Sequence, residues 1–180
     1  RGPNLWSKNT SIEALVYCEE DERLYDRFAT IEMRARSALP GIGSLRATGF
    51  EQNNIALAHI LSRVALRFQV EAGSQVTFAH VSDNITTGYF RVVVQYEEEE
   101  LARAAFDEAH KLILAALAGE EFDSKTAIDR LKEIFEDCTL GPSTGSIVNA
   151  ALRRGFAVAV RLVPALGVVG FQRAGEQRRG

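Results

Sequence analysis

The chain has 180 residues, enough for one large domain with a sizeable core, and its 46% of apolar residues is ordinary for a globular protein. The formal net charge of −3 provides no excess of positive charge to hold a phosphate backbone, so nucleic acid is not an expected partner. No apolar run approaches the roughly 20 residues that cross a bilayer, so no membrane association is expected either.

The two cysteines, Cys18 and Cys138, are far apart in the sequence and match no metal-binding spacing. They indicate free thiols in a reducing, cytoplasmic compartment, although a single disulfide is also compatible with the sequence.

The first 72 residues predict a strand followed by two helices. Apolar and polar residues alternate from Ser11 to Cys18, which is typical of a strand. Charges at helical spacing predict a helix over 21–38, which ends before Pro40. A stronger helix is predicted over 53–72, and Gly73 supplies its C-terminal stop. Its apolar side is formed by Leu57, Leu61, Val64 and Phe68.

A β-hairpin is predicted next, with strands near 75–80 and 88–97. Asp83, Asn84 and Gly88 mark the segment between them as the hairpin loop. The acidic run Glu97 to Glu100 then opens a predicted helix over 98–117, where negative charge suits the helix dipole.

Beyond this helix, another helix is predicted over 125–137, and Ser143 is a plausible N-cap for a further one over 144–153. Residues 156–163 are β-like, and the polar tail over 172–180 is expected to be frayed or part of a linker. Because the hairpin is antiparallel and helices do not alternate strictly with strands, the predicted fold class is α+β. We expect a small, mainly antiparallel sheet with helices packed on one face.

Two short stretches extend the interpretation from fold to family. The chain opens with Arg-Gly-Pro-Asn-Leu-Trp, and residues 140–144 read Leu-Gly-Pro-Ser-Thr. Both stretches, in this order and at this separation, resemble cyanophycin synthetases, as do the helix over 57–73 and the strand over 88–99. The motif positions are Arg1, Gly2, Pro3, Asn4, Trp6, Gly141, Pro142, Ser143 and Thr144.

The resemblance implies a role in making cyanophycin, a polymer with an aspartate backbone and arginine attached to the side-chain carboxylates. In the family, an ATP-grasp domain and a Mur-ligase-like domain perform the two ATP-dependent additions, and the N-terminal domain is thought to hold the polymer. On this basis residues 1–139 form the N-terminal domain. Residues 140–180 form a junction toward an ATP-grasp domain that this sequence does not contain. ATP and Mg²⁺ are then expected only in the parent's other domains, and no cofactor in this segment.

His59 bears on whether this segment is itself an enzyme. Some family members resemble His-Val-x-Glu-His-x-x-Leu-Glu here, and they are implied to carry a metal-dependent peptidase-like site. In this chain Ser62, Arg63 and Arg67 replace the Glu, the second His and the last Glu. A hydrolytic zinc site needs about three protein ligands, and a guanidinium brings positive charge where a cation should sit. We therefore expect neither a metal site nor catalysis, although His59 can also be a plain helix residue.

The same substitutions predict a binding surface. Arg63 and Arg67 follow His59 at helical spacing, and guanidinium groups can pair bidentately with carboxylates. The simpler alternative is a solvated helix face. Glu97, Glu98 and Glu99 could likewise meet arginine side chains of a polymer, or could merely begin a helix.

The sequence thus predicts a non-catalytic accessory domain that binds the arginyl-aspartate polymer and scaffolds ligase domains on the same chain, as part of a homo-oligomer. Two alternatives stay open, a metal-dependent peptidase-like domain that clips polymer into primers and a purely architectural oligomerisation domain.

Overall fold

A four-stranded antiparallel sheet forms one layer of the computed structural model, which describes residues 10–18, 22–42, 53–83, 88–139 and 166–173. Its strands are β1 (Ser11–Cys18), β2 (Ala79–Asp83), β3 (Tyr89–Gln95) and β4 (Leu166–Arg173), in the spatial order β2-β3-β1-β4. Every neighbouring pair is antiparallel, so β2 and β4 are the two edges of the described sheet.

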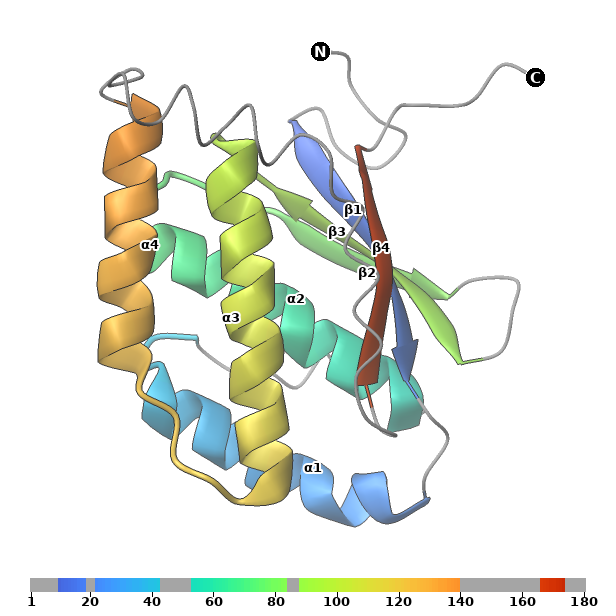
Figure 1. Ribbon diagram of the computed structural model, residues 1–180. Helices are drawn as coiled ribbons and strands as arrows, with labels where there is room; N and C mark the ends of the chain where they lie inside the picture. Colours follow the sequence, from blue (N-terminus) through green and yellow to red (C-terminus); the bar gives the residue numbers. More distant parts are fainter. Residues whose placement is uncertain (1–9, 19–21, 43–52, 84–87, 140–165, 174–180) are drawn as a thin grey trace, which may run out of the picture.

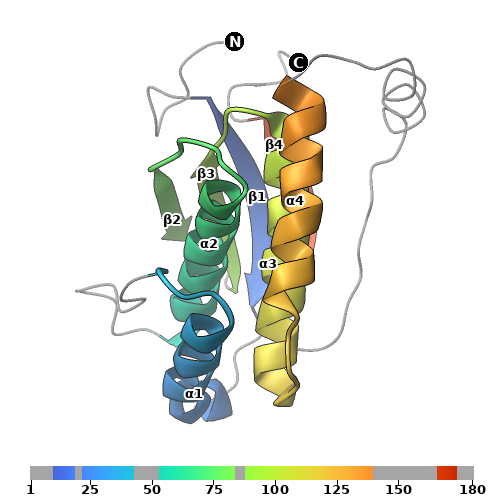
Figure 2. The same cartoon turned by 90° about the vertical axis from the view of Figure 1, so that its left-hand side faces the viewer.

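Four helices cover one face of this sheet, as the α+β prediction requires (Figure 1). They are α1 (Glu22–Ala38), α2 (Asn53–Glu71), α3 (Glu99–Ala118) and α4 (Ser124–Thr139). Helix α2 packs on β2 and β3, α3 packs against α2 and α1, and α4 lies on the outside of α3 (Figure 2). None of the described helices combines the length and the apolar character needed to cross a bilayer.

The predicted apolar patterns produce the core. On β1 the side chains of Ile12, Ala14, Val16 and Cys18 are completely buried, because alternate residues of a strand point to the same face of the sheet. On α2 the predicted apolar side is buried as well, with Phe68 at 0% exposure. Burying one such large apolar side chain contributes about 1.5–3 kcal/mol, so α2 is anchored firmly between the sheet and α3.

The predicted hairpin is correct in kind but displaced in its first strand. That strand was expected near 75–80, whereas β2 runs from Ala79 to Asp83 and takes in Asp83, which was expected in the loop. The displacement arises because the backbone ladder is only half complete before Ala79. The Gln95 amide still donates to the Phe78 carbonyl oxygen at 2.9 Å, but the amides on the other strand turn to a side chain. The amides of Thr77 and Phe78 both donate to Oε1 of Gln95, at 3.1 Å each.

Strand β4 was not predicted. It pairs with β1 along its length, with a register shift between Leu15 and Val16. Two glycines, Gly167 and Gly170, weaken its local strand signal, so the pairing with β1 fixes it. The predicted helix over 144–153 and the β-like stretch over 156–163 lie outside the described residues. The division of the chain at residue 139 stays a prediction.

Candidate functional site

Helix α2 carries one polar stripe on an otherwise buried surface. We call His59, Arg63 and Arg67 the α2 stripe. All three are half-buried, whereas most other residues from Leu57 onward are buried. Residues four apart lie on the same side of a helix, so the stripe is continuous along two turns. The structure thus brings these three predicted residues together.

Arg67 is held in a fixed position. Its Nη2 donates to Oε1 of Glu71, one turn further along α2. The guanidinium also lies against Gly41, where a Cβ atom would be only 2.7 Å from Nη2. Gly41 has a φ of +94°, so glycine is favoured there for both its backbone and its lack of a side chain. The Nε atom of Arg67 is buried and makes no hydrogen bond to a described group.

Arg63 differs from Arg67 because it makes no ion pair with another described residue. Its charge instead acts on His59, whose pKa is lowered from its ordinary 6.5, first by burial and then by the nearby guanidinium. At neutral pH His59 is therefore an uncharged imidazole, and the positive charge of the stripe comes from the two arginines.

Ser62, which stands where related helices are expected to have a glutamate, has a structural role. Its side chain is buried, and Oγ donates to the carbonyl oxygen of His59 at 2.8 Å. The donor set on this helix is therefore one imidazole, one hydroxyl engaged with the backbone and two guanidiniums, which does not fit a zinc site. Within the described ranges, no three His, Cys, Asp or Glu side chains gather closely enough to hold a metal ion.

The predicted acidic positions behave differently, because the fold uses two of them. Oε2 of Glu97 accepts hydrogen bonds from Ser74 Oγ at 2.8 Å and from the Gln75 amide at 3.0 Å. Oε1 of Glu99 accepts from Arg103 one turn along α3, at 3.0 and 3.2 Å.

Glu98 is the N-cap residue of α3, but its side chain makes no capping hydrogen bond. Of the three acidic candidates, Glu97 ties the end of β3 to the end of α2, and Glu99 stabilises the first turn of α3.

The two cysteines add no chemistry to this site. Cys18 and Cys138 are both free thiols, and burial raises the pKa of Cys18 to about 12, which keeps it protonated and unreactive. The two family motifs lie outside the described residues, at Arg1, Gly2, Pro3, Asn4, Trp6, Gly141, Pro142, Ser143 and Thr144.

Sequence reasoning missed two residues that shape the stripe. Glu71 could have been found, because it stands four residues after Arg67 and this spacing favours a helical ion pair. Gly41 gave no such signal, because its contact with Arg67 joins residues from different elements that only the fold brings together.

Comparison with known proteins assigns the family. The family model for the cyanophycin synthase-like N-terminal domain matches residues 29–118, which is half of the chain and runs from within α1 to the end of α3. This chain belongs to that family. The α2 stripe and the acidic run thus both lie within the family's N-terminal domain.

Curated relatives agree with this assignment. The cyanophycin synthetases of Trichormus variabilis and of a Nostoc species are each 34% identical to this domain over 102 residues. The match covers 55% of this chain and 11% of each relative. The cyanophycin synthetase of Geminocystis herdmanii is 29% identical over 106 residues, which is 57% of this chain and 12% of that protein. This chain therefore corresponds to a small part of the synthetases that it resembles.

Proposed function

We propose that this domain is the N-terminal accessory part of a cyanophycin synthetase and binds the growing arginyl-aspartate polymer through the α2 stripe. In this role it scaffolds the ATP-grasp and Mur-ligase-like domains that elongate the polymer with ATP and Mg²⁺, and it performs no chemistry itself. The relatives that it matches are named for the synthesis of this polymer.

The observation that supports this proposal is the pair of arginines on α2. Arg67 is pre-positioned by Gly41 and Glu71, and Arg63 has no described ion-pair partner. Arginine attached to an aspartate side chain through its amine keeps a free carboxylate, so the polymer presents one carboxylate per repeat. A guanidinium can hold such a carboxylate through two parallel hydrogen bonds.

The expected strength of each contact is low. An exposed ion pair contributes about 0–1 kcal/mol, so stable attachment needs several contacts along the polymer. Salt weakens exposed pairs because mobile ions screen them. Polymer binding should therefore depend on the number of repeats and fall steadily as salt is raised.

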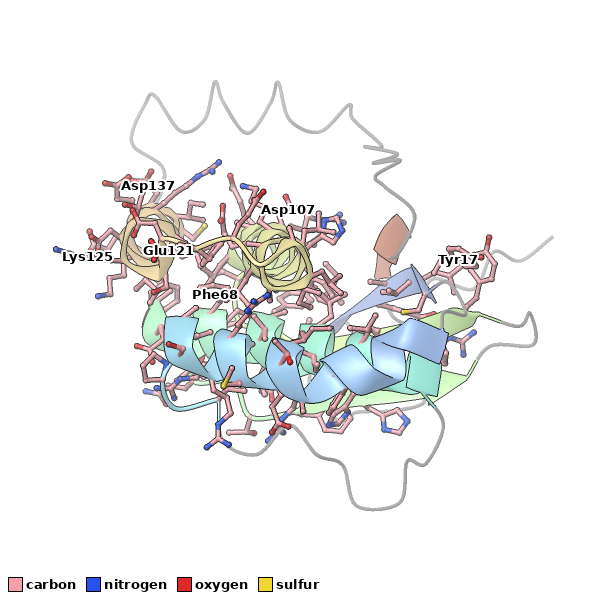
Figure 3. The ribbon with its side chains drawn as sticks, turned by 90° about the horizontal axis from the view of Figure 1, so that it is seen from below. Tyr17, Phe68, Asp107, Glu121, Lys125 and Asp137 are labelled. Atoms are coloured by element: carbon pink, nitrogen blue, oxygen red, sulfur yellow. The ribbon has the colours of Figure 1, made fainter. Side chains whose placement is uncertain are left out.

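Co-sedimentation of the purified domain with insoluble cyanophycin, at low and high salt, tests the proposal. The variant pair Arg63→Gln and Arg67→Gln removes two positive charges from the stripe and should lower the bound fraction several-fold at low salt. The matched control is Lys125→Gln with Lys132→Gln, which removes the same charge from the exposed side chains of α4. In Figure 3, Lys125 lies on the outer side of α4, away from α2.

Each alternative predicts a different result. If the wild-type domain does not sediment with cyanophycin at low salt, polymer binding is wrong and a purely architectural role is favoured. If both double variants bind equally well, the polymer uses another surface. A metal analysis that finds stoichiometric zinc bound through His59, together with release of Asp-Arg peptides, would support the peptidase-like alternative.

A further inference from the structure

One edge of strand β2 pairs with no other described strand, and its geometry is suited to receive an added strand. The amide of Gln95 donates to the carbonyl oxygen of Phe78 at 2.9 Å, and the register places Ala79 opposite Val94. In an antiparallel pair, residues alternate between pointing their backbone groups at the partner and away from it. His80 and Ser82 therefore face β3, whereas the N–H and C=O groups of Ala79, Val81 and Asp83 point outward.

This edge lacks several of the features that usually prevent strand addition, although the strand is short and ends in the charged Asp83. Proteins protect edge strands with lysine, proline, bulges or covering elements. The sequence of β2 is Ala-His-Val-Ser-Asp, with neither lysine nor proline, and its register against β3 is continuous over all five residues. Within the described part of the chain, β3 is the only strand that pairs with β2.

The α2 stripe lies on the same side of the molecule as this edge. Gln69 of α2 donates to the carbonyl oxygen of Gln95 at 3.1 Å, which identifies the side of the helix that faces the sheet. Phe68 packs on Phe122, between α3 and α4, with ring centroids 6.2 Å apart. His59 precedes Phe68 by nine residues, or about two and a half helical turns, so it lies opposite the α3 side of the helix. Arg63 and then Arg67 each lie about 40° further round the helix, away from the side that faces the sheet.

The figures agree with this placement. In Figure 2, β2 lies to the left of α2, whereas α3 and α4 lie to its right. Figure 1 shows that α2 and the β2–β3 hairpin run in roughly the same direction. The side of α2 that no other described helix covers and the edge of β2 that no described strand pairs therefore border one surface.

The spacing of this surface suits an extended peptide. Successive members of the stripe are four residues apart, a rise of about 6 Å along the helix. Alternate residues of a strand, which point to the same face, are about 6.7 Å apart. Groups on alternate residues of a strand added to β2 would thus match the spacing of His59 and Arg63, whereas Arg67 lies further from the sheet, against Gly41.

We propose that the aspartate backbone of the polymer binds as an additional strand on the outward edge of β2, with a carboxylate of the polymer next to Arg63. This inference rests on the proposed function and adds the binding mode. Backbone hydrogen bonds at the edge supply affinity for a peptide chain, and the arginines select one that carries carboxylates. An anionic polymer without peptide groups lacks the first of these contacts.

Hydrogen exchange gives a direct test on the unmodified domain. The probe is a soluble synthetic aspartate peptide with arginine on every side chain. Bound probe should slow exchange at the Ala79 and Val81 amides, which point outward, and should change the amides of His80 and Ser82 much less, because these already pair with β3. Unchanged exchange at Ala79 and Val81 under saturating probe would overturn the strand-addition mode.

A variant pair gives a second test. Ala79→Pro removes an outward N–H group and places a ring at the edge without removing a hydrogen bond to β3. It should weaken probe binding about tenfold, the effect of losing a backbone hydrogen bond and close contact at the edge. Ala79→Val keeps the N–H group and should bind like the wild type. If Ala79→Pro fails to fold by circular dichroism, the exchange measurement decides alone.

The outcomes separate this inference from the proposed function. If the probe binds and the stripe variants weaken it, but Ala79→Pro binds normally, the polymer uses the stripe without the edge, and the strand-addition mode is wrong. If the wild-type domain binds neither the probe nor insoluble cyanophycin at low salt, both proposals fail.

Discussion

Two charged regions of this domain look alike in the sequence but have different partners in the structure. The α2 stripe and the acidic run at the start of α3 are both short series of like charges on or next to a helix. In the acidic run, Glu97 bonds Ser74 and Gln75, and Glu99 bonds Arg103. In the stripe, Arg67 pairs with Glu71, whereas Arg63 makes no ion pair with another described residue. The contrast teaches that the local partners of a charge, more than its spacing, decide whether it is available to a ligand.

The largest effect is expected on the buried side of α2, which holds the stripe in place. Phe68→Ala removes a fully buried aromatic ring between α2 and Phe122, and should lower the free energy of unfolding by about 3–5 kcal/mol. Urea denaturation measures this loss. The control is Met33→Ala, because Met33 is 63% exposed and its replacement should change stability by no more than about 0.5 kcal/mol. A loss at Phe68 as small as that at Met33 would contradict the described packing.

A smaller effect should distinguish two neighbouring glutamates. Glu97→Ala removes the acceptor for Ser74 and Gln75 and should cost about 1 kcal/mol of stability. Glu98→Ala removes a side chain that makes no capping hydrogen bond, so it should leave stability nearly unchanged. Polymer binding should be the same for both variants. Loss of binding in either one would make the acidic run part of the ligand surface and remove the contrast with α2.

The smallest effect concerns His59 and pH. Because the pKa of folded His59 lies below its unfolded value of 6.5, the unfolded chain binds more protons as pH falls. Stability linked to His59 is therefore complete above pH 6.5 and is lost as pH falls from there through the lower folded pKa. His59→Gln should flatten this part of the stability–pH curve, measured by urea denaturation.

The same histidine reports on its neighbour. Arg63→Gln removes a nearby positive charge, so it should raise the pKa of His59 in an NMR titration. Arg103→Gln, on α3, should leave that pKa unchanged. If the pKa of His59 is the same in Arg63→Gln as in the wild type, the two side chains do not form one charged surface in solution.

Local patterns were sufficient to predict β1 and the positions of the four helices, because alternation and helical periodicity record which face of each element is buried. They failed for β4, whose pairing with β1 depends on a partner more than a hundred residues away in the sequence. For the site, spacing predicted that His59, Arg63 and Arg67 share one side of a helix. It could not predict that Gly41 would hold Arg67, because that contact comes from tertiary structure.

The side-chain amide of Gln95 determines where the β2–β3 hairpin can accept an added strand. Oε1 of Gln95 takes the hydrogen bonds of Thr77 and Phe78, while its backbone oxygen receives Gln69 from α2. Because its side chain takes two amide hydrogen bonds that would otherwise extend the backbone ladder, Gln95 sets where β2 begins. Its backbone also links the hairpin to α2. Gln95 thus fixes both where β2 begins and how α2, with its arginines, is positioned along the hairpin. A substitution at position 95 would therefore shift the edge of β2 relative to the α2 stripe.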